Sequence, residues 1–248
     1  MFHLAAYTAA ALANVADTDI PALTDDILLI QNSHFVPANN LNIVAAQVMS
    51  ATLSRVKLVQ PTLRQITTPF IRPIVRGAIP VDLAGVADYR QNPLVAYGQE
   101  ELAMQATSAV AMTERFYGLV WLCPRWEIPA PRAPFLLRGT STTTATIATW
   151  STIVTTWQDT PRSGNYQVTG LLVQSTNAVA SRLIFEDQTW RPGAPSITTI
   201  NNQGSYFFLY GNMGVFGRFN AYRPPVVQVL CNVADAVHEI YLEISRID

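Results

Sequence analysis

Two stretches of the chain, each eleven residues long, resemble one another. Residues Ser54–Arg64 read SRVKLVQPTLR, and residues Ser181–Arg191 read SRLIFEDQTWR. Four of the eleven positions are identical, and three further positions match in character: Val56 with Leu183, Leu58 with Phe185 and Leu63 with Trp190. The offset, from residue 54 to residue 181, is 127 residues in a chain of 248. This spacing indicates a tandem duplication of a unit of about 120 residues, a common domain size.

Two weaker similarities support the same reading. Asn42–Ser50 resembles Gln167–Ser175 just upstream of the first pair. Arg115–Cys123 resembles Arg223–Cys231 at an offset of only 108, which predicts about 19 extra residues in the first copy. Pro129–Pro134 (PAPRAP) is a stiff linker by composition. The sequence therefore predicts a first domain over residues 1–128 and a second over 135–248.

Strand patterns dominate both halves. In His238–Ile244, apolar Ile240, Leu242 and Ile244 alternate with Glu239, Tyr241 and Glu243, as in a strand with one buried face. Turn-forming segments rich in Pro and Gly separate such runs, and this spacing favours an all-β sandwich or barrel. The other expected strands are Ile27–Gln31, Asn42–Met49, Ser54–Val59, Phe116–Cys123, Thr143–Trp157, Tyr166–Gln174, Ser181–Phe185, Tyr206–Tyr210 and Val226–Cys231.

One helix is expected, over Gln99–Glu114, inside the extra length of the first copy. Glu100 and Glu101 stand where a helix dipole favours acidic side chains, and Arg115 stands at the opposite end. Leu102, Ala106 and Ala109 would form a narrow apolar stripe on this helix.

The composition indicates a folded protein whose surface carries little charge. Charged residues make up 13% of the chain and hydrophobic residues 49%, against about 25% charged residues in ordinary soluble domains. Fifteen of the sixteen basic residues are Arg, and Lys57 is the exception. Arg is enriched in protein interfaces and Lys depleted, so much of the surface is expected to contact other proteins. Codon usage in a GC-rich genome is the alternative explanation for the Arg bias.

Motifs for catalysis, cofactors and metals are missing from the sequence. The three histidines, His3, His34 and His238, are far apart, and Cys123 and Cys231 fit buried free thiols. Asp25-Asp26 could bind Ca²⁺, but the spaced ligands of a dedicated loop are absent. We therefore expect no enzyme, no cofactor and no metal site. Because basic residues are scattered, we also expect no direct, sequence-specific binding of nucleic acid.

The segment Tyr206–Phe219 (YFFLYGNMGVFGRF) concentrates aromatic residues among three glycines. One interpretation is an aromatic platform for a glycan or a partner subunit, with Tyr206, Phe208, Phe216 and Phe219 at the interface. The other is a buried strand followed by a hairpin or loop. At the N-terminus, Phe2, Leu4 and Tyr7 are expected to form an arm that points inward or clasps a neighbouring subunit.

This layout resembles the double jelly-roll major capsid proteins of tailless icosahedral phages and related DNA viruses. The duplicated blocks Ser54–Arg64 and Ser181–Arg191, the linker Pro129–Pro134 and the helical insertion near Gln99–Glu114 carry the resemblance. It implies two consecutive eight-stranded jelly rolls with a helix inserted in the first. It further implies a structural coat protein that forms pseudo-hexagonal homotrimers, which tile an icosahedral shell.

The same resemblance implies the partners and the location. The partners are neighbouring trimers and minor capsid or vertex proteins, and members of this family often enclose an internal membrane. The location is the virion, after assembly in the host cytoplasm. The alternative function is a β-sandwich module, such as a receptor-binding spike or a lectin, that uses Tyr206–Phe219 to contact a receptor or glycan.

Overall fold

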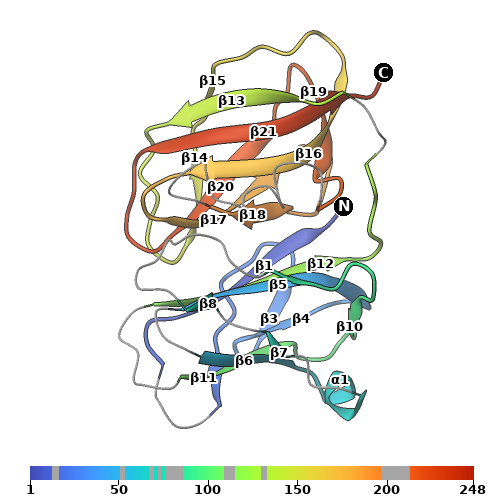
Figure 1. The fold of residues 1–248 in the computed structure, drawn as a ribbon, viewed down its shortest axis with the longest axis vertical. Helices are drawn as coiled ribbons and strands as arrows, with labels where there is room; N and C mark the ends of the chain where they lie inside the picture. The colour runs from blue at the N-terminus through green and yellow to red at the C-terminus, as the bar shows by residue number, and fades with distance from the viewer. Residues whose placement is uncertain are drawn as a thin grey trace. The chain divides into compact units, whose positions relative to one another are not determined.

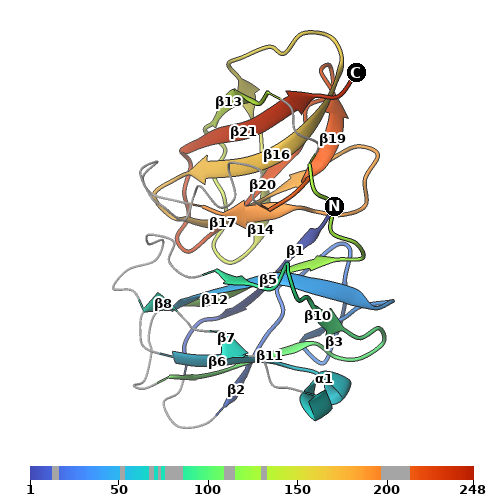
Figure 2. The same cartoon turned by 45° about the vertical axis from the view of Figure 1, so that its right-hand side comes forward.

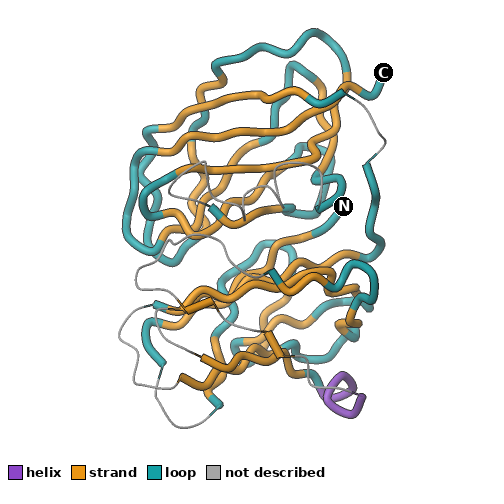
Figure 3. The backbone as a smooth tube through the Cα atoms, viewed as in Figure 1, coloured by secondary structure: helices purple, strands orange, loops and turns teal. Residues whose placement is uncertain are grey.

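The computed structural model is all-β, and a single short helix occurs among the residues that it describes (Figure 3). The chain divides into two compact units. The N-terminal unit comprises Leu4–Arg125, and the C-terminal unit comprises Trp126–Asp248 together with Met1–His3. The described residues are 1–12, 17–50, 54–66, 70–71, 74–75, 86–108, 115–129, 133–196 and 213–248.

The N-terminal unit contains two main sheets (Figure 1). Across the first sheet the strands are β1 (His3–Ala9), β12 (Phe116–Cys123), β5 (Leu41–Ser50) and β10 (Leu94–Ala96). Across the second they are β2 (Thr18–Ile20), β11 (Ala103–Ser108), β6 (Ser54–Val59) and β7 (Phe70–Ile71). Short β8 (Ile74–Val75) and β9 (Ala87–Asp88) also pair with β5, and β3 (Leu29–Gln31) pairs with β4 (His34–Val36) as a separate hairpin.

The C-terminal unit repeats this plan, and Figure 2 shows its two sheets from a second direction. Across one sheet the strands are β15 (Thr156–Trp157), β13 (Phe135–Ser141), β21 (His238–Arg246), β16 (Asn165–Gln174) and β19 (Gly217–Asn220). Across the other they are β14 (Trp150–Ile153), β20 (Val226–Cys231), β17 (Ala178–Ile184) and β18 (Gly193–Pro195).

Eight strands of each unit follow one strand order. In the C-terminal unit, β15 is the addition; in the N-terminal unit, β3, β4, β8 and β9 are the additions. When the remaining eight strands are counted along the chain, the first sheet reads first, eighth, third, sixth in both units. The second sheet reads second, seventh, fourth, fifth in both units. The two units are thus topologically equivalent.

Two of the three sequence similarities join equivalent strands. Ser54–Val59 forms β6 and Ser181–Ile184 lies in β17, and each is the fourth strand of its unit. The upstream pair lies on β5 and β16, the third strands. The third similarity is misleading because β12 is an eighth strand whereas β20 is a seventh. The insertion of about 19 residues inferred from it is therefore wrong.

The helix expected over Gln99–Glu114 is also wrong. Residues Ala103–Ser108 form strand β11, which pairs with β6 along its whole length and with β2 on its other side; residues 109–114 lie outside the described part. Hydrogen bonds on both edges outweigh the weak local preference of this Ala-rich segment for a helix.

The one helix among the described residues is α1 (Pro61–Ile66). Its first turn does receive an acidic group, because the Glu100 carboxylate accepts a hydrogen bond from the Thr62 N–H at 3.0 Å. The acidic residue thus serves a helix that is distant in sequence, and not one that it begins.

The core of the C-terminal unit follows the alternation expected from the sequence. Ile240, Leu242 and Ile244 are fully buried on β21, and they face buried residues of the opposite sheet, as in a β-sandwich. The strand expected over Thr143–Trp157 is divided into two short strands, Trp150–Ile153 and Thr156–Trp157. Before them, Ala145 and Ile147 form isolated bridges.

Candidate interaction surface

The N-terminal residues expected to form an arm lie in the chain's own core. Phe2, Leu4 and Tyr7 are at most 1% exposed. Phe2 contacts Phe216 edge-on, with ring centroids 4.8 Å apart, and the Tyr7 hydroxyl donates a hydrogen bond to the Leu102 carbonyl at 2.7 Å. The expectation of an arm is wrong because Leu4 and Tyr7 lie in β1, Phe2 directly precedes it, and all three side chains are buried within the monomer.

The described end of the aromatic segment, residues 213–219, contains two buried aromatic side chains. Phe216 is fully buried, and Phe219 is 7% exposed and stacks on Tyr166 at 5.7 Å. These two residues therefore support the buried-strand interpretation and contradict the exposed platform. Tyr206 and Phe208, the other two expected interface residues, lie outside the described residues.

Exposed apolar side chains are concentrated in the C-terminal unit. Among the described large hydrophobic residues, nine exposed ones belong to this unit, whereas Leu29 alone belongs to the N-terminal unit. The nine are Ile128, Phe135, Leu136, Ile147, Val154, Tyr222, Val226, Val233 and Val237. Where such side chains gather into one patch, they mark a protein-contact surface.

Three loops meet at one end of the C-terminal unit and carry part of this apolar surface. They connect β13 to β14 (142–149), β16 to β17 (175–177) and β20 to β21 (232–237). Ile147 forms a bridge with Cys231, which places the first loop beside the start of the third. Ile147, Val233 and Val237 are 45%, 53% and 67% exposed; we call these three residues the loop-end patch.

Asp235 forms hydrogen bonds with residues of all three loops. Its Oδ2 accepts hydrogen bonds from the Ser175 hydroxyl (2.7 Å) and the Asn177 N–H (2.8 Å), and its Oδ1 accepts one from the Val237 N–H (3.2 Å). Its backbone pairs with Ala145 in the first loop. Burial works to raise the pKa of Asp235, but these hydrogen bonds outweigh it and hold the pKa below its usual value.

His238 and Cys231 complete the loop junction. His238 is fully buried at the start of β21, and its Nδ1 lies 3.1 Å from the Ser175 hydroxyl oxygen. Burial lowers the pKa of His238, although Asp235 opposes the shift. Cys231 and Cys123 are both free, buried thiols, as the sequence predicted. Burial, aided by Asp235, raises the pKa of the Cys231 thiol to about 12, so the group stays protonated.

The described surface has a pocket in each unit. One, of about 440 Å³, lies in the C-terminal unit between Asn165, Gln188, Arg218, Asn220 and Asp248. Its polar groups are already committed: Asp248 accepts from Arg246 and the Asn165 N–H, and Asn220 donates to Asn165. The other, of about 370 Å³, lies in the N-terminal unit beside Asp19, His34 and Glu101. Neither pocket assembles a catalytic group of residues.

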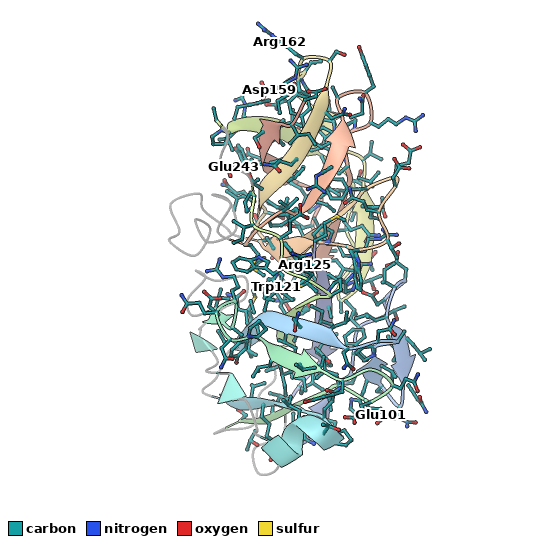
Figure 4. The ribbon with its side chains drawn as sticks, turned by 90° about the vertical axis from the view of Figure 1, so that its right-hand side faces the viewer. Glu101, Trp121, Arg125, Asp159, Arg162 and Glu243 are labelled. Atoms are coloured by element: carbon teal, nitrogen blue, oxygen red, sulfur yellow. The ribbon has the colours of Figure 1, made fainter. Side chains whose placement is uncertain are left out.

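The acidic residues proposed as a cation site perform a structural role. The Asp25 Oδ1 accepts hydrogen bonds from the Ile27 N–H at 2.8 Å and the Leu28 N–H at 3.1 Å, which closes a turn. Glu101, labelled in Figure 4, accepts a hydrogen bond from Asn32 at 2.7 Å. Among the described residues, no group of three or more His, Cys, Asp or Glu side chains is arranged to hold a metal ion.

Most arginines of the C-terminal unit have acidic or aromatic partners. Arg138 pairs with Asp159 at 3.1 Å, Arg246 pairs with Asp248 at 2.7 Å, and Arg223 pairs with Glu186 at 2.5 Å. The Arg182 guanidinium lies 4.5 Å from the ring centroid of Trp150. The arginines are therefore distributed among local pairs instead of forming one basic patch.

Comparison with known proteins adds one structural similarity. No protein-family model matches the chain, and no curated protein matches it. The major capsid protein P2 from bacteriophage PM2 is similar over 98% of this chain and 97% of its own, with 10% sequence identity and a TM-score of 0.22. A TM-score of this size does not establish a common fold, so fold and function are argued from the chain's own strands.

The sequence contains a signal for the loop-end patch, namely apolar residues within a loop. Val233 and Val237 stand in the segment NVADAV between two strands, although loop residues are normally polar. Large apolar side chains within a loop are themselves a sign of a contact surface. The role of Asp235 could not be found in the same way, because its partners are 58 and 60 residues away.

Proposed function

We propose that this protein is a viral coat subunit built from two tandem jelly rolls. The observation that carries the proposal is the strand order shared by the two units. A jelly roll is an eight-stranded double sheet used widely in viral capsids. Its strands lie in the order first, eighth, third, sixth in one sheet and second, seventh, fourth, fifth in the other. Both units have this order.

The low charge of the surface supports a self-assembling role. Only 13% of residues are charged, and within the described ranges most exposed large apolar side chains belong to the C-terminal unit. A subunit surrounded by copies of itself has to desolvate most of its sides, which is costly for charged groups. The apolar surface is therefore assigned to contacts between copies.

The assembly unit in this proposal is a homotrimer. Three copies with two rolls each give six similar domains, so a trimer has a nearly six-fold outline and can tile a closed icosahedral shell. The subunit is then located in the virion, assembled in the host cytoplasm, next to minor capsid or vertex proteins and an internal membrane. The role is structural and not enzymatic. No helix among the described residues is long and apolar enough to cross a membrane.

The receptor- or glycan-binding alternative has less support. Its contact surface was the aromatic segment that ends at Phe219, and Phe216 and Phe219 are buried. The aromatic rings that remain exposed in the described part, such as Tyr222, do not gather with polar groups into a sugar-binding pocket.

The proposal is tested by the mass and shape of the purified protein. We expect light scattering to detect trimers or larger species and electron microscopy to show closed particles or hexagonal plates. Replacing Val233 and Val237 together by Asp should lower the assembled fraction about tenfold, because charges at a packed contact must be desolvated. Thr152→Asp, at an exposed polar site of β14, is the matched control and should assemble normally. A protein that stays monomeric at every concentration contradicts the proposal.

A further inference from the structure

The proton positions in the loop junction follow from its hydrogen bonds. The Ser175 hydroxyl donates its only proton to Asp235 Oδ2 at 2.7 Å. The same oxygen therefore accepts from His238, whose Nδ1 lies 3.1 Å away. Nδ1 of His238 therefore carries a proton, and burial favours the neutral form of the ring, in which Nε2 carries none. Its other nitrogen, Nε2, is buried and has no hydrogen-bond partner in the described structure.

Protonation of His238 is unfavourable in this arrangement. A proton can be added only at Nε2, which has no hydrogen-bond partner in the described structure, and it would bring a positive charge into a buried site. The Asp235 carboxylate and the backbone carbonyls of Thr143 and Asp235 favour the charged ring, but burial outweighs them and lowers the pKa of His238. The other titratable groups of the junction compensate only in part. The hydrogen bonds that link the Asp235 carboxylate to His238 pass through the Ser175 hydroxyl, and the Cys231 thiol stays neutral. Glu239 lies on the exposed face of β21 and accepts a hydrogen bond from Tyr241. From β13, the residue paired with His238 is Ser141, which does not titrate.

We propose that His238 is an acid-sensitive latch on the junction of the 142–149, 175–177 and 232–237 loops. When His238 is neutral, the Asp235–Ser175–His238 chain holds the three loops in one arrangement. When it is protonated, the junction opens so that the imidazolium reaches water. The loop-end patch is carried on these loops, so opening redistributes Ile147, Val233 and Val237. The latch is a property of the single chain; its effect on assembly rests on the proposed coat function.

The direction of the pH dependence follows from linkage. A histidine whose pKa is lower in the folded state stabilises the closed junction above its ordinary pKa of 6.5, and this stability is lost as the pH falls through the lowered value. Asp235 also has a lowered pKa, so it remains ionised down to pH 3.8 and below. Opening between neutral pH and about pH 5 is therefore assigned to His238 and not to Asp235.

Hydrogen exchange with mass spectrometry on the full chain tests the latch. After correction for intrinsic exchange rates, amides in the three loops should exchange about tenfold faster at about pH 5 than at about pH 7.5, whereas amides of β16 and β21 should not change. His238→Gln keeps an amide donor for Ser175 but does not titrate, so its loops should exchange equally at both pH values. His34→Gln, in the N-terminal unit, is the control and should keep the acid response.

A second measurement covers the case in which His238→Gln does not fold. In an NMR titration of the unaltered protein, the His238 ring, assigned by scalar coupling, should titrate below pH 6.5. A His238 that titrates above 6.5, or a loop response that persists in His238→Gln, overturns the proposal. Loss of assembly in the Val233/Val237 variant bears on the coat function alone, so the two proposals fail separately.

Discussion

Glu243 shows at the scale of one residue how burial can override a sequence pattern. The alternation along His238–Ile244 placed Glu243 on the polar face of its strand. In the structure it is only 6% exposed, and its Oε1 accepts a hydrogen bond from the Thr169 hydroxyl at 2.6 Å (Figure 4). Burial raises the pKa of Glu243. The strand alternates as predicted at its start. Whether the polar face of the strand is also buried depends on tertiary packing, which the sequence of the strand does not encode.

This burial makes Glu243→Gln a stabilising change. At neutral pH the carboxylate pays a desolvation penalty, whereas an amide oxygen still accepts the Thr169 hydrogen bond without a charge. We expect the free energy of unfolding in urea to rise by about 1 kcal/mol at neutral pH. The gain should shrink as the pH falls through the raised pKa, because Glu243 then takes up a proton in the folded state. A variant that is less stable than the parent at neutral pH would show that the carboxylate charge has a partner.

At the scale of elements, strand β1 decides between an arm and a core element. Phe2→Ala should lower the free energy of unfolding of the C-terminal unit by about 3 kcal/mol, because the Phe2 ring is buried against Phe216. The control is Leu29→Ala, since Leu29 is 64% exposed and its truncation should change stability by less than about 0.5 kcal/mol. Urea unfolding of dissociated subunits provides the measurement. An unchanged stability in Phe2→Ala would restore the interpretation of the N-terminus as an arm.

The sequence predicted those strands whose pattern is local. It did not predict strands whose formation depends on hydrogen-bond pairing with distant parts of the chain. Alternation identified β21, a continuous apolar run of strand length identified β12, and the repeated motif matched β6 with β17. The sequence predicted a helix over Ala103–Ser108 because its small residues, and the acidic Glu100 and Glu101 just before it, fit a helix as well as a strand. Their pairing with both β6 and β2 settles the matter, and it involves residues far away in the chain.

At the scale of the whole molecule, the coat proposal makes a prediction about salt. Two kinds of subunit contact fit the composition: apolar contacts such as the loop-end patch, and ion pairs made by the fifteen arginines. Salt separates them, because at about 1 M the Debye length falls to about 3 Å and exposed ion pairs weaken, whereas excluded salts strengthen apolar burial. Arg138, Arg223 and Arg246 of the C-terminal unit pair within their own chain, so we expect the apolar side chains to form the contacts between copies. Sedimentation velocity should therefore show assemblies that persist at about 1 M sodium chloride and grow in sodium sulfate. Dissociation at high salt would assign the contacts to arginine ion pairs and remove the loop-end patch from the interface.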